Sequence, residues 1–396
     1  MKTRSKRILA AGLLTTAALT LAACSRSSVP VAVILPLTGQ YATYGVAIEK
    51  GIKLAYEELK EEKELAVKID GFKVRDTKSE LDRVVLWTEK EIDGGAIAII
   101  GGVTTAEAKA MIPIVDKKGV LLLSPSASSP ELSGISKNFF RVWPSDQTEA
   151  TKLAQSAYGE LGAKTLVVVA GEDPYSKGAE AVFKAAYQAA GGQILETIEY
   201  PASSRDLSGV AVRVTELQPH GVFVADYADG AARFIGDLRN RQFAGRILTT
   251  SAFATSAAVE RLGQNAQGVI LAQAAFDVNS TDEDIKTFVG SFKTAYGEVP
   301  DIYAAYGYDA MRALSHAAQG RQITSADLIG GLRSDAFKSY EGITGPISFD
   351  DKGDVMKTPR LYTIGADLKP VLLDPSTLPP VPPPAPPAAP ADSAGG

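Results

Sequence analysis

Short apolar segments alternate with amphipathic helical segments along most of this chain, and this alternation restricts the possible fold more than any other feature. The first part of this alternation contains four predicted strands, at residues 31–35, 67–74, 96–100 and 120–123. Three predicted helices separate them, at residues 45–59, 80–93 and 106–117. Strands without polar alternation, separated by helices, are typical of a parallel sheet that helices cover on both faces. We therefore predict an α/β fold.

The same pattern restarts near Pro144. Five more predicted strands follow, at residues 165–170, 193–200, 221–225, 246–250 and 268–272. Helical patterns occupy residues 151–161, 178–190, 208–217, 231–241, 284–296 and 302–319. A chain of 396 residues is also longer than a single hydrophobic core usually supports. Two consecutive α/β units therefore predict two lobes.

The N-terminus has the pattern of an export signal. Residues 1–7 carry four basic side chains, residues 8–19 are largely apolar, and small residues precede Cys24. The apolar run is too short to span a bilayer. The sequence Leu-Ala-Ala-Cys that ends at Cys24 resembles the bacterial lipobox, in which the cysteine is lipidated and becomes the mature N-terminus. We interpret 1–23 as a signal peptide and 24–30 as a lipid-anchored linker; the alternative is an ordinary signal peptide with a chance cysteine.

The composition argues against several classes of site. Cys24 is the sole cysteine, so the folded body can form no disulfide and no cysteine metal site. His220 and His316 lack the spacing of a zinc site. The formal net charge of −5 becomes −9 once the four basic residues of the signal peptide are removed, which argues against nucleic acid as a partner. We expect neither a metal nor a cofactor.

Motifs that would indicate an enzyme are missing from the sequence. There is no G-x-S-x-G motif, and Gly101-Gly102 is not followed by the Lys-Ser/Thr pair of a phosphate loop. We therefore expect a binding protein and not an enzyme. From residue 375 onward the chain is rich in Pro and Ala and has little apolar mass, which predicts an extended tail.

Hydroxyl-bearing residues gather in two loops that follow predicted strands of the first unit. Open parallel sheets bind ligands at the carboxyl ends of their strands. Thr104 and Glu107 have the spacing of a capping box, which opens a helix with free backbone N–H groups. Together with the hydroxyls of Thr105, Ser126 and Ser128, these groups would bind a carboxylate well. The alternative is that these residues only cap helices and form turns.

Four motifs occur in order along the chain. They are PLTG at 36–39 with Tyr44-Gly45, SPSASSPEL at 124–132, FRV at 140–142 with Asp146-Gln147, and GPISFD at 345–350 with KGD at 352–354. As a set they resemble the leucine/isoleucine/valine-binding family of periplasmic solute-binding proteins, the receptors of branched-chain amino acid ABC transporters. The resemblance extends over about residues 31–374.

The resemblance implies a two-lobed type I periplasmic-binding-protein fold, in which each lobe is a parallel sheet flanked by helices and a hinge lies between the lobes. We expect lobe 1 to comprise residues 31–145 and 277–354, and lobe 2 residues 146–276 and 355–374. Residues 375–396 would then be a disordered Pro/Ala-rich tail.

The same resemblance implies where the ligand lies. Thr105, Ser126 and Ser128 would hold its carboxylate and ammonium groups from lobe 1, and aromatic side chains from both lobes would flank it. The candidate ligand-binding residues are Tyr44, Thr104, Thr105, Ser126, Ala127, Ser128, Tyr175, Asp226, Tyr227 and Ser251.

The sequence departs from the family near Ser251, where members that bind amino acids have an acidic residue for the ammonium group. Residues 249–252 read Thr-Thr-Ser-Ala, without an acid. We hypothesise that Asp226 or Asp229 supplies the charge. Otherwise the ligand lacks an ammonium group, since a buried ammonium without a carboxylate is costly.

These observations predict an exported, lipid-anchored monomer on the periplasmic or cell-surface side of a membrane. It would capture a small carboxylate-bearing solute, such as a branched-chain or other hydrophobic amino acid, and deliver it to an ABC transporter permease. The alternatives are an aromatic or other organic acid as ligand, and a role as a sensor or regulatory lipoprotein.

Overall fold

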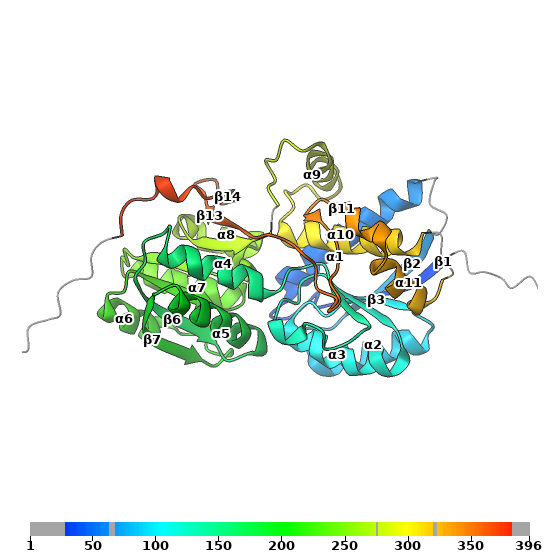
Figure 1. The fold of residues 1–396 in the computed structure, drawn as a ribbon, viewed down its shortest axis with the longest axis horizontal. Helices are drawn as coiled ribbons and strands as arrows, with labels where there is room; N and C mark the ends of the chain where they lie inside the picture. The colour runs from blue at the N-terminus through cyan, green and yellow to red at the C-terminus, as the bar shows by residue number, and fades with distance from the viewer. Residues whose placement is uncertain (1–27, 63–67, 275, 320–322, 382–396) are drawn as a thin grey trace, which may run out of the picture.

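The computed structural model describes residues 28–62, 68–274, 276–319 and 323–381. Two α/β lobes lie side by side and are joined in the middle of the molecule (Figure 1). This arrangement confirms the predicted two-lobed fold class. The predicted signal peptide and Cys24 lie outside the described residues.

Lobe 1 is built on a five-stranded parallel sheet with the order β2-β1-β3-β4-β5. Its strands are β1 (Ser28–Leu35), β2 (Lys68–Asp76), β3 (Ala98–Gly101), β4 (Leu121–Ser124) and β5 (Phe139–Arg141). Its helices are α1 (Ala42–Glu61), α2 (Leu81–Asp93), α3 (Thr105–Lys118), α9 (Glu283–Tyr296), α10 (Ile302–Ala318) and α11 (Ser325–Leu332). Every residue of β3 and β4 is buried, as expected of strands covered on both faces.

Lobe 2 is built on a seven-stranded sheet with the order β14-β13-β10-β9-β8-β6-β7. Its strands are β6 (Thr165–Gly171), β7 (Gln193–Tyr200), β8 (Gly221–Ala225), β9 (Arg246–Thr249), β10 (Ile270–Gln273), β13 (Arg360–Ile364) and β14 (Pro370–Leu372). Its helices are α4 (Asp146–Tyr158), α5 (Pro174–Ala189), α6 (Ser208–Leu217), α7 (Ala228–Asn240) and α8 (Ser256–Leu262). β13 pairs antiparallel with β10, and β14 pairs antiparallel with β13. A short hairpin, β11 (Glu341–Gly342) with β12 (Gly345–Pro346), precedes them.

The chain passes between the lobes after β5, after β10 and before β13, so the described residues include three crossings. At the first crossing, α4 begins at Asp146, five residues earlier than its apolar pattern predicted. Ser145 caps this helix by accepting a hydrogen bond from Gln147 N–H. The earlier start brings Asp146 and Glu149 into the first helical turn, next to the junction of the lobes.

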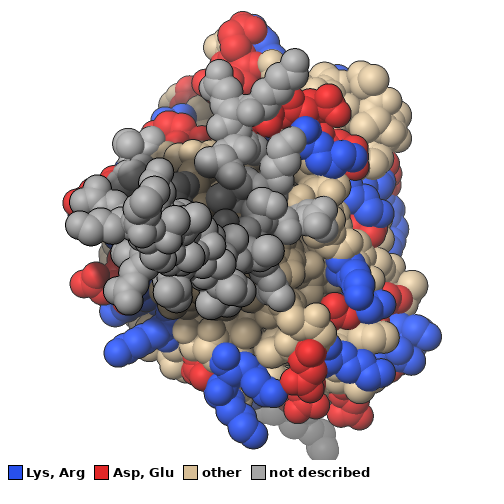
Figure 2. Space-filling view, turned by 90° about the vertical axis from the view of Figure 1, so that its right-hand side faces the viewer, with Lys and Arg blue, Asp and Glu red and all other residues tan. Residues whose placement is uncertain are grey.

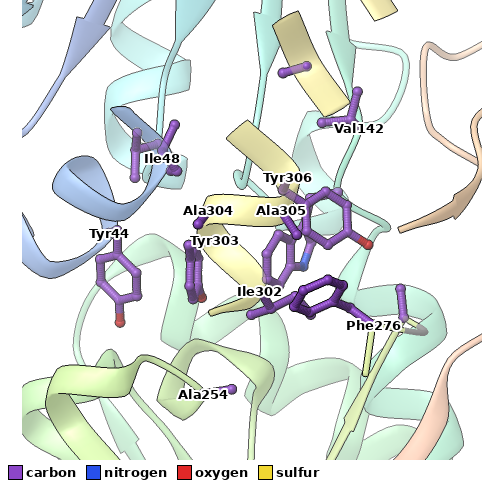
Figure 3. Close-up of a cluster of buried hydrophobic side chains, with 14 of the residues drawn as sticks. Tyr44, Ile48, Val142, Ala254, Phe276, Ile302, Tyr303, Ala304, Ala305 and Tyr306 are labelled. Carbon is purple, nitrogen blue, oxygen red and sulfur yellow. The ribbon is translucent and has the colours of Figure 1, made fainter. Parts of the chain in front are cut away.

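Helices α1 and α10 approach each other closely within lobe 1. A Cβ atom at Gly51 would lie 1.9 Å from the carbonyl oxygen of Ala304, and one at Gly307 would lie 2.3 Å from that of Ile48. Only glycine permits this approach. The close packing sets Tyr44 on α1 beside Tyr303 on α10, as Figure 3 shows.

The segment after Pro375, predicted to be an extended tail, packs against lobe 2 as far as it is described. Pro375–Thr377 forms a 3-10 turn, and Leu378 contacts the hydrophobic core of lobe 2. The Arg246 guanidinium donates a hydrogen bond to the carbonyl oxygen of Pro379. In residues 375–381 the structure thus has a short turn and two contacts with lobe 2, made by Leu378 and the Pro379 carbonyl.

Basic and acidic side chains are interspersed on the face of lobe 1 that Figure 2 shows, with no continuous basic surface among the described residues there. Within the described ranges, no helix is both long and apolar enough to cross a bilayer. The same residues contain no group of three His, Cys, Asp or Glu side chains placed to ligate a metal.

Candidate functional site

A small cavity of about 20 Å³ lies between the lobes, at the carboxyl ends of the parallel strands. The lining residues are Tyr44, Val103, Thr105, Ser126, Ala127, Ser128, Trp143, Tyr175, Tyr227, Ser251, Ala252 and Tyr303. All the predicted site residues except Thr104 and Asp226 are among them. The space is about enough for one water molecule. A larger ligand therefore enters while the lobes are apart, and the cavity must widen when they close around it.

Thr104 and Thr105 are adjacent in sequence but have different roles. The Thr104 hydroxyl accepts from Glu107 N–H (3.1 Å), and the Glu107 carboxylate accepts from Thr104 N–H (3.2 Å), which completes the predicted capping box. Thr104 is thus used to begin α3. Thr105 faces the cavity, is 1% exposed, and its hydroxyl has no hydrogen-bond partner among the described residues. A free hydroxyl beside the first N–H groups of a helix is well placed to bind an anion.

The two serines of the loop after β4 already use their hydroxyl hydrogens inside the protein. Ser126 Oγ donates to the carbonyl oxygen of Val103 (2.8 Å), and Ser128 Oγ donates to Asp146 Oδ2 (2.9 Å). In this conformation both serines present acceptor lone pairs, and Thr105 is the hydroxyl free to donate. The sequence pattern could not distinguish these roles.

Arg141 fixes the backbone on both sides of Ser128. Its guanidinium donates to the carbonyl oxygens of Ser129 (2.8 Å) and Ala127 (3.4 Å). It also donates to Asp354 Oδ1 (2.7 Å), and the Arg141 side chain is fully buried. Arg141 therefore couples the hydroxyl-rich loop to the chain that approaches the third crossing.

Aromatic rings from both lobes form the remaining wall. The Tyr227 ring centroid lies 4.7 Å from that of Tyr175 and 5.9 Å from that of Tyr44. Tyr303 stacks on Trp143 at 4.8 Å. Trp143 and Tyr303 are absent from the sequence-based site. Trp143 follows β5, a three-residue strand too short to recognise from its pattern, so no predicted strand end precedes it in the sequence.

Tyr44 connects the two lobes directly. Its hydroxyl donates to the carbonyl oxygen of Ala252 (3.1 Å) and accepts from Ala228 N–H (2.6 Å). Both partners belong to lobe 2, and the Tyr44 hydroxyl points away from α1 toward that lobe (Figure 3). The structure is therefore a closed form in which a cavity residue holds the lobes together.

The two acids proposed to face the ligand lie elsewhere. The Asp226 carboxylate accepts from the Tyr200 hydroxyl and from Tyr227 N–H (2.6 Å), and burial raises its pKa to about 6. Asp229 forms an ion pair of 2.6 Å with Arg261 at the surface. Neither residue lines the cavity, so this hypothesis is corrected: their hydrogen-bond partners hold both carboxylates away from it.

An acid does lie near Ser251, but it comes from a distant part of the sequence. Ser251 Oγ donates to Glu149 Oε2 (2.5 Å), and Ala274 N–H donates to Glu149 Oε1 (3.2 Å). Glu149 is 4% exposed, and burial raises its pKa to about 8. The two residues are 102 positions apart, so only the fold brings them together.

A second, larger groove of about 740 Å³ lies along α1, α8 and the loop between α9 and α10. None of the predicted site residues lines it, and a Lys50–Glu298 ion pair of 2.6 Å belongs to its wall. The convergence of strand ends and buried hydroxyls marks the smaller cavity as the candidate site.

Comparison with known families identifies this architecture. The periplasmic binding protein family matches residues 28–366, which is most of the chain. The chain belongs to this family. The family prediction made from the sequence motifs is therefore confirmed.

Curated relatives of this periplasmic binding protein are distant. A Leu/Ile/Val-binding protein homolog from Brucella melitensis biotype 1 is 26% identical over 222 residues, which covers 56% of this chain and 59% of that relative. The chain thus spans less than two thirds of that relative's length. The leucine-, isoleucine-, valine-, threonine- and alanine-binding protein of Pseudomonas aeruginosa is 20% identical over 83% of this chain and 87% of the relative.

Solved structures share the fold across nearly their whole length. A leucine-binding protein from Thermotoga maritima is 26% identical with a TM-score of 0.81, covering 87% of this chain and 98% of that one. A second structure is a branched-chain amino acid transporter substrate-binding protein from Streptococcus pneumoniae in complex with isoleucine. It is 22% identical with a TM-score of 0.80, covering 87% of this chain and 97% of that one. A solute-binding protein from R. palustris, in complex with benzoate, is 21% identical with a TM-score of 0.79 over 87% and 95%.

The structure also gives a physical reason for two sequence motifs of this periplasmic binding protein. The FRV and KGD segments, far apart in sequence, meet at the Arg141–Asp354 ion pair. In addition, Arg141 N–H donates to the carbonyl oxygen of Gly353 (3.1 Å). A Cβ atom at Gly353 would lie 2.4 Å from the carbonyl oxygen of Phe139, and its φ is +83°, so glycine is required there.

Proposed function

We propose that this protein is the substrate-binding protein of an ABC importer and captures a small carboxylate-bearing solute between its lobes. One observation carries the proposal. The Thr105 hydroxyl is buried, lies at the start of α3, and has no hydrogen-bond partner among the described residues, although it faces the cavity between the lobes. A ligand carboxylate would accept from this hydroxyl and from the first N–H groups of the helix.

The aromatic rings of Tyr44, Trp143, Tyr175 and Tyr227 would surround the apolar part of the solute. A branched-chain or other hydrophobic amino acid suits this lining. The names of the Brucella, Pseudomonas, Thermotoga and Streptococcus proteins support such a ligand. Closure of the lobes, stabilised by Tyr44, would give the permease a single loaded shape to recognise.

An aromatic or other organic acid without an amino group is the second candidate. The ring-rich wall favours it, and so does the fact that no carboxylate among the described residues lines the cavity. The benzoate complex of the R. palustris protein supports this alternative. A thermal-shift screen of hydrophobic amino acids and benzoates tests both candidates. The screen includes the amide of each compound, in which an uncharged group replaces the carboxylate, because a carboxylate site requires the amides to give no shift.

We further propose that the solute is bound and not converted. Mass spectrometry of solute recovered from the purified protein should return it unchanged. The protein would act as a monomer, which size-exclusion chromatography checks.

Export and lipid anchoring remain proposals that rest on Cys24 and the sequence before it. Replacement Cys24→Ala should release the protein from the membrane fraction or block its processing. Membrane partitioning equal to that of the wild type would exclude anchoring through this residue.

A further inference from the structure

We infer that Glu149 determines ligand specificity by acting through Ser251, so that the cavity prefers a solute with a protonated amino group over its deaminated analogue. Glu149 is a positioning residue in this account, since Ser251 and not Glu149 lines the cavity. The inference rests on the proposed function and selects between its two ligand classes.

The hydrogen bond between Ser251 and Glu149 determines whether Ser251 offers a donor or an acceptor to the cavity. When Glu149 is ionised, Ser251 must donate its hydrogen to Glu149 Oε2, at 2.5 Å. The lone pairs of Ser251 Oγ then remain for a donor in the cavity. Ser128 is oriented in the same way by Asp146, at 2.9 Å. Acid-backed hydroxyl oxygens suit an ammonium group, while the free Thr105 hydroxyl suits a carboxylate.

The charges around Glu149 leave its carboxylate uncompensated. Asp146 lies on the same helix and opposes its ionisation. From α10 the facing titratable groups are the phenols of Tyr303 and Tyr306, whose pKa values are raised by burial and by this carboxylate. No Lys or Arg among the described residues forms an ion pair with Glu149, and the Arg141 guanidinium acts on Asp146.

A cation in the cavity would therefore be the compensating charge that the protein itself lacks. Burial raises the pKa of Glu149 to about 8, so the carboxyl is largely protonated in the empty protein near neutral pH. An ammonium group beside Ser251 would favour the ionised form, and the proton of Glu149 would pass to the solvent. A deaminated acid brings no such charge and would leave the proton in place.

The experiment compares matched probes on matched variants. The probes are L-leucine with 4-methylpentanoate, and L-phenylalanine with 3-phenylpropanoate, each pair differing by one amino group. The variants are Glu149→Gln, which keeps the side-chain shape, and Asp226→Asn as a buried acid outside the cavity. Titration calorimetry at pH 7 in buffers of different ionisation enthalpy gives affinity and proton release together.

The inference predicts that wild type and Asp226→Asn favour the amino acid of the better-bound pair and release protons on binding it. In Glu149→Gln the affinity for that amino acid should fall about ten- to hundredfold, and the affinity for the deaminated analogue should stay within about threefold. Proton release should fall to what Asp146, whose pKa burial raises to about 7, still supplies. Proton release by the wild type is informative even if the variant folds poorly.

Two results would overturn the inference in different ways. Equal wild-type affinity for both members of a pair, or an unchanged preference in Glu149→Gln, would overturn the inference alone. The protein would still bind a solute, and Glu149 would only hold Ser251 and Ala274 in place through its hydrogen bonds. Failure of all four probes to bind would instead refute a hydrophobic amino acid as the ligand, and the inference with it.

Discussion

The Tyr44 hydroxyl donates a 3.1 Å hydrogen bond to the carbonyl oxygen of Ala252 and accepts one of 2.6 Å from Ala228 N–H, which joins lobe 1 to lobe 2 beside the candidate site. Both contacts must break when the lobes separate. The free energy of closure therefore depends on a side chain that also lines the cavity.

Replacement Tyr44→Phe should weaken solute binding about thirtyfold, because the closed form loses two hydrogen bonds worth about 1 kcal/mol each while the ring remains. Calorimetry with the best solute from the thermal-shift screen measures the effect. Tyr296→Phe is the matched control, since the Tyr296 hydroxyl donates to the carbonyl oxygen of Lys50 (2.9 Å) within lobe 1. Equal affinities for the two variants would refute a role of Tyr44 in closure.

Replacement Asp354→Asn should destabilise the protein by about 3–5 kcal/mol, because it leaves the buried Arg141 guanidinium without its anionic partner. The melting temperature should fall by roughly 10 °C. Asp93→Asn, which breaks the exposed ion pair with Lys118, should cost less than about 1 kcal/mol. If thermal unfolding showed comparable losses of stability in the two variants, the buried Arg141–Asp354 pair would stabilise the protein no more than the exposed pair does.

The empty protein should become more heat-stable as the pH falls from 8 to 5. Burial raises the pKa of Glu149 to about 8 and that of Asp146 to about 7, above their ordinary values near 4. Between these limits the folded protein retains protons that the unfolded chain loses, so stability decreases as the pH rises. Glu149→Gln should flatten this dependence. A melting temperature that rises with pH over this interval, or a variant with the wild-type slope, would contradict the assignment.

Deletion of residues 382–396 should leave the melting temperature unchanged, whereas deletion of residues 376–396 should lower it by a few degrees. The longer deletion removes Leu378 from the lobe 2 core and the Pro379 carbonyl from Arg246. Solute affinity should be the same in both proteins, because no residue of the described segment 376–381 lines the cavity. If the protein with the longer deletion had the melting temperature of the full chain, the contacts of residues 376–381 with lobe 2 would contribute no stability.

Local patterns predicted the two α/β units and the loops that hold Thr105, Ser126 and Ser128. The family resemblance added Tyr44, Tyr175, Tyr227 and Ser251. Apolar runs define buried strands, strand ends define the loops, and the loops after β3 and β4 bring Thr105 and Ser128 to the cavity. Short elements escaped prediction because three residues, as in β5, carry no periodicity. Trp143 was missed for that reason.

Long-range side-chain pairs could not be predicted from the sequence. Asp226 follows a strand and was a reasonable candidate, yet the Tyr200 hydroxyl and Tyr227 N–H hold its carboxylate away from the cavity. Glu149 lies in the first turn of a helix, where acids usually serve as partners of the helix dipole. Its hydrogen bond to Ser251 depends on how α4 packs against the crossing at Ala274, which no local pattern encodes.

The most direct test of the account is calorimetric titration of ligand-free protein with the carboxylate that gives the largest thermal shift, in the wild type, Thr105→Val and Thr104→Ala. The account predicts one binding site per chain and about ten- to hundredfold weaker binding in Thr105→Val, which loses the free donor to a charged group. Thr104→Ala should lower stability by about 1 kcal/mol through the lost helix cap and leave affinity within about threefold. Unchanged affinity in a folded Thr105→Val protein, or no carboxylate that binds the wild type, would contradict the central claim.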